Sequence, residues 1–241
     1  MRALRLARRM SQVDLAAMLE LSQGRISQLE HGDGSFSAEQ LLLLGRFFNV
    51  PLTDFLGDGG DASHHAQVQN ALARLGATNL WESDAIVPDE RLRDAGPVVV
   101  EALLLGDPRL VVGVAPVLVK QLDRVSLPWI DAQLRGVGGG RRLPWVVDNT
   151  LAAIDLGRAR PLPRDVASSY RRAETVLGAY LAARAHETGA TDVPDLLDGT
   201  IRSKQSLQLV RARSSEQSRR WAIVSGLGPH DFASALEAAR A

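Results

Sequence analysis

The sequence predicts a mainly α-helical protein with two domains, a small one at residues 1–57 and a larger one at residues 67–241. Apolar residues recur at intervals of three and four over most of the chain, which is the spacing of a helix face. Serine or aspartate repeatedly precedes such a stretch, as expected of helix caps. The chain has 241 residues, of which 45% are hydrophobic, which is enough for two cores. Residues 58–66 are rich in glycine and aspartate and lack periodicity, so we expect a linker there.

The first two helices are expected before Leu21. One runs from the N-terminus to about Arg9. The next is capped by Ser11, whose hydroxyl can accept a hydrogen bond from a backbone amide, and Asp14 completes a partial capping box. Its apolar stripe consists of Leu15, Ala16 and Leu19. Because Ala16 is small, a second helix can approach closely at a steep angle.

A third helix follows after a tight turn, and its outer face is polar. Ser22 is its expected cap, and Ile26 and Leu29 form its buried side. The residues left pointing outward are Gln23, Gly24, Arg25 and Gln28. A short helix that exposes polar side chains at its beginning is typical of a DNA reader.

Two more helices complete the first domain. Ser37 and Gln40 form a capping box for the fourth helix, whose apolar face contains Leu41, Leu44 and Phe48. Pro51 stands at the first position of a short fifth helix that ends at Gly57.

From about Leu4 to Leu56 the sequence resembles the phage repressor and Cro type of helix-turn-helix, also called the xenobiotic-response-element (XRE) family. The matching positions are Leu4-Arg5, Ser11-Gln12, Leu15-Ala16, Ser22, Ile26-Ser27, Glu30, Gly32, the helix from Leu41 to Phe48, and Val50-Pro51-Leu52. This covers roughly a quarter of the chain. The resemblance implies a five-helix, phage-repressor-like DNA-binding domain whose third helix enters the major groove.

The resemblance also implies the residues that contact DNA. They are Gln12, Ser22, Gln23, Gly24, Arg25, Ser27 and Gln28. A glutamine amide can pair with adenine, and arginine with guanine or a phosphate, whereas the alternative is a polar face that is merely solvated. The family places a glutamine at the position of Gln12 against a phosphate. Gly24 departs from the usual polar residue, which weakens a base contact there.

Arg5 and Glu30 have the spacing of a buried ion pair that ties the first helix to the third in phage repressors. We therefore assign them a structural role. The charge of residues 1–57 is balanced, with six arginines (2, 5, 8, 9, 25, 46) against six carboxylates (14, 20, 30, 33, 39, 54). Phosphate affinity must then come from local placement, and dimerisation is needed for useful affinity.

The larger region is expected to be helical. Its predicted helices span residues 67–75, 97–105, 108–122, 125–134, 145–156 and 165–187, with a break at residues 136–142. Asp107 followed by Pro108 is a strong helix start, and Pro116 should kink that helix. A strand over residues 110–119 is the alternative. We assign this region to dimerisation and to an effector or partner.

Several classes of function find no support in the sequence. The chain has no cysteine, so it has neither a disulfide nor a cysteine-ligated metal. The adjacent His64 and His65 lack further ligands at metal spacing, and residues 136–142 lack the context of a phosphate loop. No catalytic motif, membrane span or secretory signal is evident. We expect a cytoplasmic protein without cofactor that is not an enzyme.

Two functions from different classes remain. The first is a sequence-specific transcriptional regulator, a repressor that acts as a homodimer on a palindromic operator in double-stranded DNA. The second is the antitoxin of a toxin–antitoxin pair, which regulates itself through its helix-turn-helix and binds a toxin through its C-terminal region. The basic stretch from Arg202 to Arg220 would then face an acidic partner, and it could also form a second nucleic-acid surface. The favoured interpretation is a solvated helical face, followed by a return to the core at Trp221, Ile223 and Val224. A helical sensor of a small-molecule effector is a third possibility.

Overall fold

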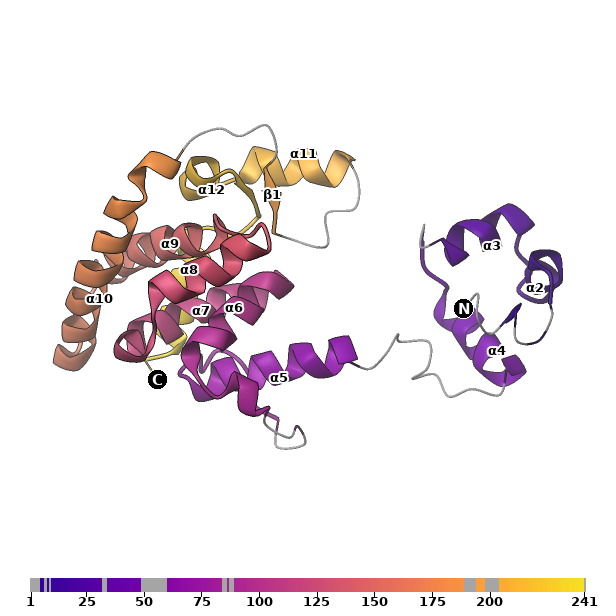
Figure 1. Cartoon of the computed structure of the whole chain (residues 1–241), viewed down its shortest axis with the longest axis horizontal. Helices are drawn as coiled ribbons and strands as arrows, with labels where there is room; N and C mark the ends of the chain where they lie inside the picture. Colours follow the sequence, from indigo (N-terminus) through magenta and orange to yellow (C-terminus); the bar gives the residue numbers. More distant parts are fainter. Residues whose placement is uncertain are drawn as a thin grey trace. The chain divides into compact units, whose positions relative to one another are not determined.

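The structure is a computed structural model, drawn in Figure 1, and it describes residues 5–6, 8, 10–31, 34–48, 60–83, 86, 89–188, 194–197 and 204–240, with residues 60–63 and 204 described by their backbone alone. Within these residues the chain is mainly helical, which confirms the predicted fold class. Its described strands form one pair of two-residue strands. The chain divides into two compact units, Met1–Ser63 and His64–Ala241.

The N-terminal unit contains three helices with defined bounds, α2 (Gln12–Met18), α3 (Gln23–Glu30) and α4 (Ala38–Phe48). Arg5 and Leu6 also have helical backbone, whereas the predicted helix at 51–57 lies outside the described residues. The core consists of Leu15, Ala16, Leu19, Ile26, Leu44 and Phe48, and these are residues of the predicted apolar faces.

All three predicted caps are present in this unit. Ser11 accepts from the Asp14 amide, and the Asp14 carboxylate accepts from the Ser11 amide in return. Ser22 accepts from the Arg25 amide. Ser37 and Gln40 form the reciprocal box at the start of α4. These bonds satisfy backbone donors that have no partner inside a helix, so they define where each helix begins.

The larger unit is a helical assembly (Figure 1). Its helices are α5 (Gly60–Arg74), α6 (Ala95–Leu105), α7 (Pro108–Lys120), α8 (Leu127–Gly136), α9 (Arg142–Gly157), α10 (Arg164–Ala183), α11 (Lys204–Arg213), α12 (Glu216–Trp221) and α13 (Pro229–Ala238). Short 3-10 turns lie at Glu90–Leu92, Leu122–Arg124 and Ala185–Glu187. The strands β1 (Asp195–Leu196) and β2 (Ile223–Val224) pair in parallel.

Helices α7 and α9 form the centre of this unit. Asp107 caps α7 and Pro108 occupies its first turn, so the predicted helix is confirmed and the alternative strand at 110–119 is wrong. Pro116 lies inside α7 and has no N–H for the carbonyl of Val112. Helix α9 packs against α13, α10, α12 and α7. Trp145 of α9 meets Phe232 of α13 edge to face, with ring centroids 5.8 Å apart.

The backbone differs from the prediction at residues 60–66, which are helical and belong to α5 rather than to an aperiodic linker. Tertiary contacts explain the difference. His64 bonds Glu101 of α6 at 3.1 Å, His65 lies 3.2 Å from Asp107, and Val68 is fully buried. Packing of this kind outweighs the weak helix propensity of Gly, Asp and Ser.

The break predicted at 136–142 is shorter than expected, because α8 reaches Gly136 and α9 begins at Arg142. The intervening residues connect two helices that pack against each other. The helix predicted at 165–187 ends at Ala183 and is followed by the 3-10 turn. The strand pair was not predicted, since two-residue strands carry no detectable periodicity.

Candidate nucleic-acid interface

The two helices of the candidate interface are joined by a turn that contains one strained residue. Helix α2 ends at Met18, and the Leu21 amide bonds the carbonyl of Ala16 at 2.9 Å. Glu20 has φ +54°, in the left-handed region. Such a conformation costs a residue with a side chain about 1 kcal/mol or more. Ser22 then starts α3, so this turn sets the angle at which α3 leaves α2.

A hydrogen-bond chain runs from the domain interior to the exposed start of α3. Arg5 donates from Nε and Nη2 to the two carboxylate oxygens of Glu30, at 2.7 and 2.9 Å. Gln12 Nε2 donates to Glu30 Oε2 at 2.9 Å, and Gln23 Nε2 donates to Gln12 Oε1 at 2.8 Å. This series of hydrogen bonds therefore connects four side chains from three parts of the unit, namely the segment around Arg5, α2 and α3.

The ion pair at the inner end of this chain is buried. The side chain of Arg5 is 9% exposed and that of Glu30 is 1% exposed. Hydrogen bonding to Glu30 raises the pKa of Arg5, so the guanidinium remains charged. Arg5 Nη1 also donates to the Met10 carbonyl at 2.8 Å. The predicted pair therefore exists, and it ties the helical segment around Arg5 to the last residue of α3.

The outer face of α3 is accessible, as the sequence predicts. Gln23, Gly24, Arg25 and Gln28 are exposed, and Ile26 and Leu29 are buried. Arg25 Nη1 donates to Gln28 Oε1 at 3.3 Å, so these two side chains lie together on the surface. A Cβ placed on Gly24 would meet nothing within 4 Å. The glycine is therefore not required by packing within the described residues.

The other predicted contact residues are partly used within the domain. The Ser22 hydroxyl caps α3, and Ser27 is half-buried, with its carbonyl 2.7 Å from a ring nitrogen of His31. Gln12 is half-buried, and its side-chain amide donates to Glu30 and accepts from Gln23. Sequence reasoning missed this use of Gln12, because residues 18 positions apart carry no local signal of contact.

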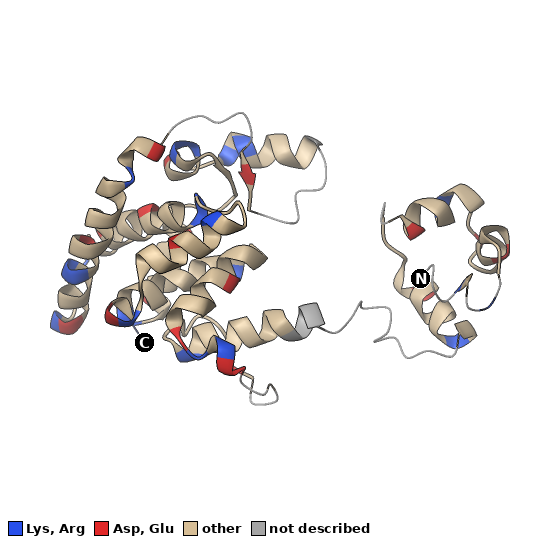
Figure 2. Cartoon of the chain, viewed as in Figure 1, with Lys and Arg blue, Asp and Glu red and all other residues tan. Residues whose placement is uncertain are grey.

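The charges of the N-terminal unit do not form a general basic field. Figure 2 shows basic residues interspersed with acidic ones along the described helices. Arg5 is neutralised by Glu30, and Arg8 bonds the carbonyl of Phe48 at 3.3 Å. On α3 the only charged residues are Arg25 and Glu30. Selectivity for nucleic acid must therefore depend on where single side chains are placed.

The basic stretch in the larger unit is partly structural. Arg220 donates to Asp148 at 3.0 Å, and the indole of Trp221 donates to the same carboxylate at 2.9 Å. Arg219 bonds the carbonyl of Ser214. The chain returns to the core at Trp221, Ile223 and Val224, as the interpretation of a solvated face requires. Arg211 and Arg213 are exposed, and Arg202 lies outside the described residues.

The part of the chain that the structure describes holds no group of three or more His, Cys, Asp or Glu side chains placed to bind a metal. None of its helices combines the length and the apolar character that crossing a membrane requires.

Comparison with known families agrees with this geometry. Residues 1–55 match the family model described as helix-turn-helix. These residues are an XRE-type helix-turn-helix domain. The protein is therefore of the DNA-binding, transcription-regulator kind, and the family is not one of enzymes. No curated protein and no solved structure matched the chain.

Proposed function

We propose that this helix-turn-helix protein binds a specific operator as a homodimer and represses transcription from it. The observation that carries the proposal is the hydrogen-bond chain from buried Glu30 through Gln12 to Gln23. It restrains a glutamine at the exposed beginning of α3, where members of this fold class read base edges. A side chain held in place before binding loses less entropy when it meets DNA.

Each of the predicted contact residues has a role in this proposal. Gln23 and Gln28 pair with adenine edges, and Arg25 contacts guanine or a phosphate. Gln12 has one remaining N–H, because its amide group carries two and donates one to Glu30. Together with the N-terminus of α2, that N–H approaches a phosphate. Ser22 and Ser27 contact the DNA backbone, and Gly24 allows α3 to approach the DNA closely.

Dimerisation follows from the even charge of the domain. A single copy has little net attraction for phosphates, so two copies are needed for affinity. A two-fold dimer places two α3 helices about 34 Å apart, which matches half-sites one helical turn apart. We assign dimerisation to the larger unit, because its helical core exceeds what a DNA reader of this size needs.

The test is a mobility-shift assay with DNA selected from a random duplex pool, together with light scattering of the same sample. Gln28→Ala should weaken specific binding by about 1–3 kcal/mol and relax the preference at one base pair. The matched control is Gln133→Ala, which removes an exposed glutamine of α8. An unchanged base preference in Gln28→Ala contradicts the proposed contact, and a monomeric DNA complex contradicts the dimer.

A second candidate is an antitoxin that binds an acidic toxin through α11. The observation in its favour is the exposure of Arg211, Arg213 and Leu209, the last of which is 56% exposed. Neither arginine forms an ion pair with a carboxylate within the described residues. Co-expression with the product of the neighbouring gene tests this function. Retention of that product by the wild-type chain, and its loss in an Arg211→Glu variant, would favour the antitoxin.

A further inference from the structure

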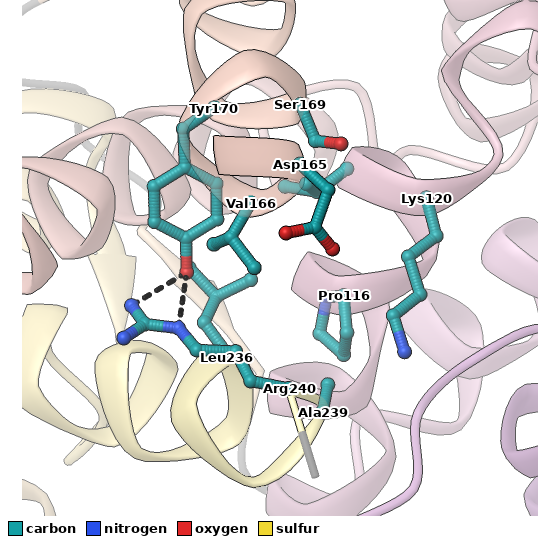
Figure 3. A pocket seen from close by; sticks show the side chains of 10 residues that line it. Pro116, Lys120, Asp165, Val166, Ser169, Tyr170, Leu236, Ala239 and Arg240 are labelled. Carbon is teal, nitrogen blue, oxygen red and sulfur yellow. Dashed lines mark hydrogen bonds between the residues drawn. The ribbon is translucent and has the colours of Figure 1, made fainter. Parts of the chain in front are cut away.

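The larger unit contains a pocket between α7, α10 and α13 (Figure 3). Its volume is about 330 Å³, within the range of small-molecule sites. The apolar part of its lining comes from Pro116, Val119, Val166 and Leu236. Pro116 stands where α7 lacks one backbone hydrogen bond. None of these residues belongs to the helix-turn-helix unit.

Two opposite charges line the same pocket. Lys120 is the last residue of α7, and Asp165 lies in the first turn of α10. Both are exposed, and neither forms an ion pair or hydrogen bond with another side chain that the structure describes. Figure 3 shows both side chains at the pocket with no contact between them. Each can therefore pair with a group of opposite charge on a ligand.

The position of Lys120 is supported by Gly76. A Cβ at Gly76 would lie 2.6 Å from Cδ of Lys120, so the lysine stem occupies the space that a larger residue would fill. Gly76 has φ +117°, which glycine adopts readily. Part of the stem therefore lies against Gly76, and Lys120 lines the pocket.

A second cation, Arg240, lines the pocket on the side opposite Lys120 (Figure 3). Arg240 donates from Nη2 and Nε to the hydroxyl of Tyr170, at 2.8 and 3.2 Å, and its guanidinium lies 5.2 Å from that ring's centroid. A phenol is neutral, so these bonds orient the arginine without neutralising its charge. Figure 3 shows Asp165 together with Tyr170, Arg240 and Lys120 around one cavity.

We propose that this pocket binds an α-amino acid with an apolar side chain. Its carboxylate pairs with Lys120, its ammonium pairs with Asp165, and its side chain packs against Val119, Val166 and Leu236. A zwitterion supplies one group for each of these two opposite charges, and the apolar lining supplies a contact for its side chain. The site goes beyond the proposed DNA binding, and it gives the larger unit an effector.

The first test is calorimetric titration of the full chain, without DNA, with each of the twenty common amino acids. At least one apolar amino acid should bind saturably. Its carboxamide and its N-acetyl derivative should each bind about tenfold more weakly or worse, because each lacks one of the two charges. The proposal is overturned if no amino acid binds, or if either derivative binds as tightly as the parent.

The second test uses variants of the pocket. Asp165→Asn and Lys120→Met should each weaken binding about tenfold or more. Asp155→Asn and Arg91→Met remove exposed charges elsewhere in the unit and should bind as the wild type does. Unchanged affinity in both pocket variants overturns the proposal. If a variant does not fold, as judged by circular dichroism, the derivative series on the wild-type chain decides. Because no DNA is present, failure here leaves operator binding to its own test.

Discussion

Removal of the Arg5 side chain should destabilise the helix-turn-helix domain severely. Arg5→Ala deletes two hydrogen bonds to Glu30 and one to the Met10 carbonyl. The carboxylate of Glu30 then remains in a site where its side chain is only 1% exposed, with the Gln12 amide still donating to it. Removing one partner of a buried ion pair costs about 3–5 kcal/mol. That is a large share of the 5–15 kcal/mol or so by which domains are typically stable.

The assay is urea unfolding of the wild type and of Arg5→Ala, followed by circular dichroism. The control is Arg46→Ala, which removes an exposed arginine from the last turn of α4 and should change stability by less than about 0.5 kcal/mol. At low temperature, where the variant is folded, its operator affinity should approach that of the wild type because Gln12 and Gln23 remain bonded. A loss in Arg5→Ala below about 1 kcal/mol would refute the buried pair as a structural tie.

Two further predictions concern stability. Glu20→Gly should raise the free energy of unfolding of the N-terminal unit by about 1 kcal/mol, because φ +54° is strained for glutamate and not for glycine; a lower melting temperature would contradict it. Burial alone would raise the pKa of Asp131, but hydrogen bonds and charge from Arg184 and Arg135 outweigh it, and the pKa is lowered from the ordinary 3.8. A carboxylate whose pKa is lowered by folding stabilises the folded state above pH 3.8, and this stability is lost as the pH falls through the folded-state pKa. The melting temperature of the larger unit should therefore drop in acid. Asp131→Asn should weaken that pH dependence. Parallel pH profiles for the variant and the wild type would argue against this role.

The sequence was informative about the domain's outline because the relevant signals are local. A cap and the amide that it serves are three residues apart, as with Ser11 and Asp14 or Ser37 and Gln40. The apolar faces repeat within a single helix, so Leu15 and Ile26 could be assigned to the core. The resemblance to phage repressors added the Arg5–Glu30 pair, which spans 25 positions and has no local signature.

The sequence was less informative where distant residues meet. His64 and His65 lie in a stretch whose composition is typical of a linker. Their contacts with Glu101 and Asp107, which explain the helix there, are made with residues distant in the sequence. The participation of Gln12 in a chain to Gln23 was likewise not foreseen. Lys120 and Asp165 are 45 positions apart, on helices whose boundaries were predicted but whose packing was not.

The amino-acid order by itself determined the helical class, the helix starts and the polar outer face of α3, since each depends on neighbours within one or two turns. Only the tertiary structure decided that Gln12 supports Gln23 and that Lys120, Asp165 and Arg240 surround one cavity. Helix periodicity states which face of a helix is apolar, but not which other helix covers it. That choice depends on how side chains fill space across the whole core.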